Sequence, residues 1–131
     1  MSKQIPKSDD ILIPVSLGEL IDKISILKIK LKKMSGEQLI NVNRELQALE
    51  AKLVEQNLKI DPILSSGLAK VNLLLWEIED KVRLKERKKD FDDEFIYLAR
   101  SVYTQNDKRA SIKREINRLY NSQIVEEKLY L

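Results

Sequence analysis

The sequence predicts an all-α protein: an antiparallel helical bundle of long, heptad-patterned helices, preceded by a short extended N-terminal segment. Its 131 residues are 43% hydrophobic and 34% charged, with only 3 Gly and 3 Pro, a composition typical of long helices. Apolar residues recur at alternating steps of three and four, as on one face of a helix. Ser or Asp precedes each such stretch, as expected of helix N-caps.

The N-terminal residues divide into two parts. Residues 1–10 are polar, and we expect a flexible tail, with residues 11–131 forming a single helical domain. The apolar stretch ILIPV at 11–15 contains Pro14, which has no N–H to donate to a ladder, so an extended edge segment is predicted.

The first helix is predicted to begin at Ser16, which has capping-box spacing with Glu19. Its apolar seam consists of Leu17, Leu20, Ile24, Leu27, Leu31 and Met34. Ile26 and Ile29 lie away from this seam, and a helix that is apolar on two sides is either central in a bundle or covered by a second subunit. The candidate interface residues on this helix are therefore Glu19, Asp22, Lys23, Ile26 and Ile29.

The second and third helices have their own start signals. The second is predicted to begin at Ser35 and to end within residues 57–61. Asp61 then caps the third helix, with Pro62 at its first position, where the missing amide costs nothing. The seam of this helix is Leu64, Leu68, Val71, Leu75, Ile78 and Val82. Heptad spacing and short connections favour antiparallel packing at a shallow angle.

A fourth helix is expected after Asp90, Asp92 or Asp93, each of which can act as its cap. Around Asn106 it either restarts or continues, and a weaker apolar stripe extends to about Tyr120. The C-terminal residues are expected to form a short tail that packs on the helices. The apolar segment at 11–15 is one place against which this tail could lie.

Two charged faces of the third helix are candidate sites. Glu79 and Arg83 are spaced i, i+4 beside the seam, and Trp76 can stack on the guanidinium. The structural interpretation is an ion-pair network, since acids beside an apolar stripe need partners. On another face, Glu77 and Asp80 could hold Mg²⁺, although no upstream acidic motif accompanies them and a structural role is favoured.

The fourth helix carries a third cluster. Arg100, Tyr103 and Asp107 share a side if the helix is continuous, with Asn106 and Arg109 close by. This array could bind a phosphate or carboxylate, or it could tie the fourth helix to the third. The structural alternative is favoured.

The absence of Cys and His excludes thiol and imidazole chemistry, and no metal site is predicted. A net charge of +3 and basic residues that form no single stripe argue against nucleic acid as a partner. No apolar run approaches the length of a membrane span and the N-terminus lacks the apolar core of a secretory signal, so we expect a cytoplasmic protein without membrane association.

Four blocks of sequence carry a family resemblance. They are residues 13–30, 74–86 and 91–117 and the EEKLY ending. In these blocks the chain resembles an uncharacterised family of small helical proteins from bacteria and marine phages, domain of unknown function number 6165. Lys28 departs from the acidic residue expected there. The resemblance implies no reaction, and it directs attention to Glu19, Asp22, Lys23, Trp76, Glu79, Asp80, Arg83, Arg100, Tyr103, Asn106, Asp107 and Arg109.

The sequence favours a non-enzymatic module that self-associates or docks a protein partner, without a cofactor. The alternative is an enzyme or binder for a phosphorylated or nucleotide-sugar ligand, with Mg²⁺ as a possible cofactor only in that case. Its candidate ligand-binding residues are Trp76, Glu79, Asp80, Arg83, Arg100, Tyr103, Asn106, Asp107 and Arg109.

Overall fold

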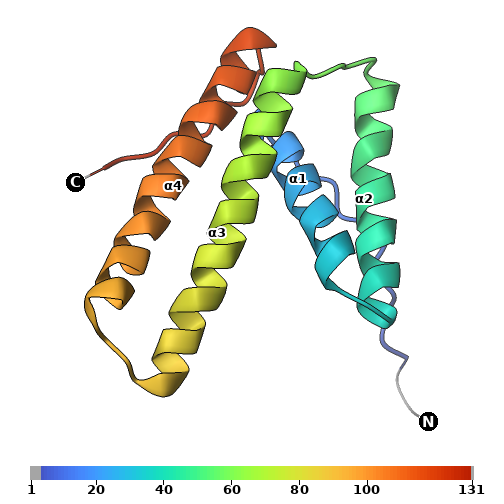
Figure 1. Ribbon diagram of the computed structural model, residues 1–131. Coiled ribbons are helices and arrows are strands. Elements are labelled where there is room, and N and C mark those ends of the chain that lie inside the picture. The colour runs from blue at the N-terminus through green and yellow to red at the C-terminus, as the bar shows by residue number, and fades with distance from the viewer. Residues whose placement is uncertain (1–3, 131) are drawn as a thin grey trace.

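The computed structural model describes residues 4–130 and contains four helices and no strand within them. The helices are α1 (Leu17–Lys33), α2 (Glu37–Glu55), α3 (Pro62–Lys88) and α4 (Asp93–Leu119). The all-α prediction is confirmed. Figure 1 shows α3 and α4 as a long hairpin, with the shorter α1–α2 pair beside its upper half and diverging from it below.

Three helices begin where their side-chain caps predict. The Oγ of Ser16 accepts a hydrogen bond from the N–H of Glu19 at 3.1 Å. Asp61 and Asp92 act in the same way at the starts of α3 and α4, each accepting a backbone N–H at 2.9 Å. These caps satisfy amides that have no partner inside the first turn of a helix.

The start predicted at Ser35 is wrong, because the N-cap of α2 is Gly36, with a φ of 62° and no side-chain capping bond. The reversal between α1 and α2 is short and requires a backbone conformation that glycine adopts without a Cβ clash. The fourth helix was expected either to restart or to continue around Asn106, and in the structure α4 continues through this residue to Leu119.

The helix α1 is central, which explains why it is apolar on two sides. Toward α2, Ile24 and Leu27 pack on Val42 and Leu46. On the other side Ile21 packs on Leu68 of α3 and Ile116 of α4. Within residues 4–130, α1 is the only helix whose backbone comes close to that of α2, and Leu53 of α2 also packs on the second cluster. One chain therefore covers both apolar faces of α1.

This arrangement corrects part of the predicted interface. Asp22 is 0% exposed and Ile29 only 8% exposed, so neither is available to a second subunit, and of the two alternatives for this helix the structure takes the central one. Glu19 and Ile26 are half-buried, and only Lys23 is exposed. The helical wheel placed all five residues away from the seam, but it could not show which neighbour covers that side of the helix.

The two ends of the chain leave the bundle in opposite directions. Residues 4–16 are non-helical and run beside the α1–α2 pair, whereas the C-terminal segment crosses α4 (Figure 1). The guess that the two segments lie against each other is therefore wrong. Within the described residues, no helix has the length and apolar character needed to cross a bilayer.

Candidate functional site

A buried polar cluster joins α1, α3 and α4, and Asp22 lies at its centre. Arg109 donates hydrogen bonds to both oxygens of the Asp22 carboxylate. Its Nε lies 3.0 Å from each oxygen, and its Nη2 also donates to Oδ2. From α3, Asn72 Nδ2 donates to Asp22 Oδ1 at 2.8 Å and to Ser25 Oγ at 3.2 Å. A single carboxylate thus connects three helices.

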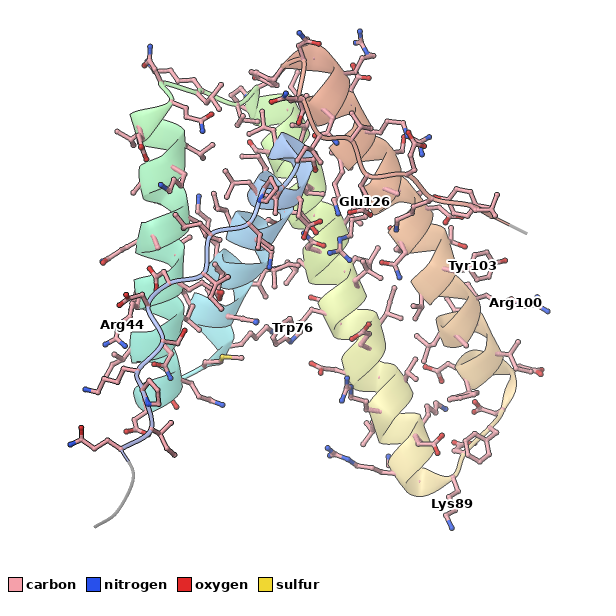
Figure 2. All side chains as sticks on the ribbon, turned by 180° about the vertical axis from the view of Figure 1, so that it is seen from behind. Arg44, Trp76, Lys89, Arg100, Tyr103 and Glu126 are labelled. Carbon is pink, nitrogen blue, oxygen red and sulfur yellow. The ribbon has the colours of Figure 1, made fainter. Side chains whose placement is uncertain are left out.

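Lys113 extends this cluster to the C-terminal segment. Its Nζ lies 2.6 Å from Glu19 Oε2, 3.8 Å from Asp22 Oδ2 and 3.5 Å from Glu126 Oε2. Figure 2 labels Glu126 on the non-helical C-terminal segment that crosses α4. The side chain of Lys113 is only 10% exposed, so the tail helps to bury it.

The start of α1 and the end of α4 approach each other closely. The N–H of Gly18 donates to Asn117 Oδ1 at 2.7 Å, and the N–H of Leu17 donates to Ser122 Oγ at 3.1 Å. A Cβ on Gly18 would lie 2.5 Å from the carbonyl oxygen of Lys113, so glycine is needed for this distance. The first amides of α1 are thereby satisfied by α4 and the tail.

The charges of the cluster stabilise one another. Hydrogen bonding to Asp22 raises the pKa of Arg109, although burial opposes this. Burial lowers the pKa of Lys113, but the bond to Glu19 and the nearby acids raise it by more, so the net shift is upward. Both cations stay protonated at neutral pH, facing the carboxylates of Glu19, Asp22 and Glu126. Within residues 4–130, every buried side-chain nitrogen or oxygen has a hydrogen-bond partner. The buried polar groups of the cluster are thus bound to one another.

A family model, described as a family of unknown function (DUF6165), matches residues 11–131. The chain belongs to this family. The match confirms the resemblance inferred from the four sequence blocks. Neither the curated proteins nor the solved structures include a match to the chain.

The structure brings four of the sequence-predicted residues of the DUF6165 chain together. Glu19, Asp22 and Arg109 belong to the cluster, and Asn106 Oδ1 accepts a bond from Arg109 Nη1 at 3.4 Å. They were predicted in two separate groups, an interface on α1 and a ligand site on α4. Their shared role is to hold these helices together.

The predicted network on α3 is not formed. Glu79, Asp80 and Arg83 are exposed, and none makes an ion pair within the described part of the chain. Trp76 is half-buried on the side of α3 that faces the end of α1 (Figure 2). The apolar seam of α3 therefore does not bury this charged face, and its acids are solvated instead of paired.

The predicted anion array on α4 also does not converge. Arg100 and Tyr103 point outward from the bundle (Figure 2), and Tyr103 is 62% exposed. Asp107 is exposed on α4 as well. Arg109 points the other way, into the cluster, because it lies about 120–180° around the helix from these three.

Sequence reasoning missed several members of the buried cluster, namely Gly18, Ser25, Asn72, Ser122 and Glu126. One signal was available. Asp22 precedes Ile26 and Ile29 by four and seven positions, so it shares their face. Once that face is recognised as buried, a partner for the acid is required.

A second ion cluster closes the turn between α3 and α4. Lys85 Nζ lies 2.8 Å from Asp92, 3.2 Å from Glu94 and 3.3 Å from Asp90. The bond to Asp92 is the main cause of a raised Lys85 pKa, and it lowers the pKa of Asp92. The Lys85 ammonium thus lies between the three carboxylates and is in contact with each of them. Among residues 4–130, no three acidic side chains are placed to hold a metal ion.

Proposed function

We propose that this protein is a non-enzymatic docking module that acts by self-association. One observation carries the proposal: the apolar segment at 11–15 lies outside the core. Ile11, Leu12 and Ile13 are 81%, 79% and 68% exposed, and Val15 is 39% exposed. Consecutive apolar side chains left in water are unfavourable in a free monomer, and such patches mark interaction sites.

The polar groups support the same proposal. The cations and acids nearest the centre of the molecule bind one another, with Asp22 fully buried. A ligand that used Arg109 would have to replace Asp22, leaving a buried carboxylate without its partner. Because Arg83 and Arg100 are exposed on different helices, no observation favours the phosphorylated-ligand alternative.

Sedimentation equilibrium tests the proposal over about 5–500 µM protein, a range that covers weak dimers. We expect the apparent mass to rise with concentration above the 15.3 kDa of one chain. A constant monomer mass across the range would contradict self-association. A thermal-shift series with nucleotides and nucleotide sugars, with and without Mg²⁺, provides the comparison, and stabilisation there would favour the alternative.

A further inference from the structure

We infer that residues 11–15 pair with the same residues of a second copy, as antiparallel strands related by a two-fold axis at Ile13. The inference rests on the proposed self-association and identifies its contact. Strand pairing through the main chain is a common mode of peptide recognition.

The backbone of this segment is available for pairing. It is non-helical, and within residues 4–130 no backbone–backbone hydrogen bond involves residues 4–15. Its side chains are also suited to a strand, since three of the five are Ile or Val, and β-branched residues are enriched in strands. The residue before a proline, Ile13, is biased toward extended backbone.

Pro14 determines which edge can pair. In a strand, successive N–H groups point to opposite edges. The edge bearing the N–H groups of Ile11, Ile13 and Val15 is complete, whereas the edge of Leu12 lacks a donor at Pro14. With Ile13 opposite the partner's Ile13, Ile11 lies opposite the partner's Val15, and these pairs exchange about six main-chain hydrogen bonds.

The charges around the segment select the antiparallel direction. Residues 11–18 are uncharged, and Asp9 and Asp10 precede them. Antiparallel pairing in this register places Asp10 and Asp9 opposite the partner's Ser16 and Leu17, which carry no charge. Parallel pairing would instead place Asp10 beside the partner's Asp10. Only the antiparallel direction therefore avoids a contact between like charges.

The location of the segment provides the support that such a ribbon needs. An isolated two-stranded hairpin is marginal in water, whereas strands that pack against helices are more stable. Figure 1 places the segment beside the α1–α2 pair. Ile11, Ile13 and Val15 share one face of the ribbon, and the 39% exposure of Val15, against 68–81% for residues 11–13, shows that the segment approaches the helices at its C-terminal end. A weak, concentration-dependent dimer follows from so small a contact.

Matched proline variants test the pairing edge. Ile13→Pro removes a donor from the complete edge in both copies, and we expect the dimer dissociation constant to rise about tenfold or more. Leu12→Pro removes a donor only from the edge already interrupted at Pro14, so a change of less than about threefold is expected. Because both positions lie outside the helices, unchanged circular dichroism will show that the fold is intact.

Single cysteines test the register, since the natural chain has none. In the paired edge the two Ile13 Cα atoms would lie about 5.5 Å apart, within disulfide range. Oxidised Ile13→Cys protein should therefore form a covalent dimer, and Leu12→Cys should form far less. Equal loss with both prolines, or equal cross-linking with both cysteines, would overturn the inference.

The two proposals fail in different ways. A wild-type dimer that survives Ile13→Pro leaves self-association standing and rejects this contact. A wild-type chain that stays monomeric rejects self-association itself.

Discussion

Asp22 on α1 and Arg109 on α4 form a bidentate ion pair across 87 residues of sequence, and the acid is fully enclosed. Such pairs add little net stability, because desolvation offsets their attraction. Removing one partner is costly, however, since the other is left as an uncompensated charge. The pair therefore favours one arrangement of α1 against the α3–α4 hairpin over others in which the carboxylate would be buried alone.

Asp22→Asn should lower the free energy of unfolding by about 2–4 kcal/mol, since Arg109 and Lys113 lose a buried acid partner. The side chain of Arg109 is 29% exposed, so partial hydration limits the loss. Urea unfolding followed by circular dichroism measures it. Lys23→Met, on an exposed neighbour, should change the value by less than about 0.5 kcal/mol, and equal effects of the two variants would refute the role given to Asp22.

Gly18→Ala should destabilise the protein by about 1–3 kcal/mol, because the new Cβ would meet the main chain of α4. A Cβ there lies 2.5 Å from Lys113 O and 3.0 Å from Asn117 Oδ1. Gly67→Ala is the matched control, since its Cβ meets only Ile112 Cδ1 at 3.5 Å. Alanine should there stabilise α3 by about 0.5–1 kcal/mol. Thermal unfolding should therefore show a lower melting temperature for Gly18→Ala and a higher one for Gly67→Ala than for the wild type.

Lys85→Met should destabilise the α3–α4 turn in a pH-dependent way. The Asp92 pKa is lowered from 3.8, first by the bond from Lys85 and then by the Phe95 amide. The Lys85 pKa is raised from 10.5. A lowered acid pKa stabilises the fold above 3.8, and a raised lysine pKa stabilises it below 10.5.

The difference in unfolding free energy between wild type and Lys85→Met should therefore be largest between pH 3.8 and pH 10.5. It should shrink as the pH falls through the lowered Asp92 pKa, and again as the pH rises through the raised Lys85 pKa. Denaturant unfolding over a pH series measures it, with the exposed Lys81→Met as control. A difference that did not vary with pH would exclude the ion cluster as its cause.

Tyr120→Phe should cost about 1–2 kcal/mol by removing two hydrogen bonds to the backbone. The Tyr120 hydroxyl accepts from the N–H of Asp61 at 2.6 Å and donates to the carbonyl of Lys59 at 3.0 Å. It thus ties the α2–α3 connection to the end of α4. Tyr97→Phe is the control, since Tyr97 is 70% exposed, and a similar loss in both would contradict this role. Chemical denaturation provides the comparison.

The sequence by itself determined the helices and most of their ends. The apolar spacing of α1 and α3 and the caps at Ser16, Asp61 and Asp92 depend on residues within one or two turns, so local chemistry is sufficient. Gly36 was the exception, because Ser35 presents the same local signal while the geometry of the turn selects glycine.

Only the tertiary structure decided which charged residues were buried. The sequence placed Asp22 on the side of α1 away from its seam and Arg109 in an anion-binding array, and their pairing depends on how α4 crosses the second apolar side of α1. The same crossing leaves Glu79, Arg83 and Arg100 in water. Helical periodicity fixes the direction of each side chain around its own axis, but the partner that meets it is set by the packing of helices distant in sequence.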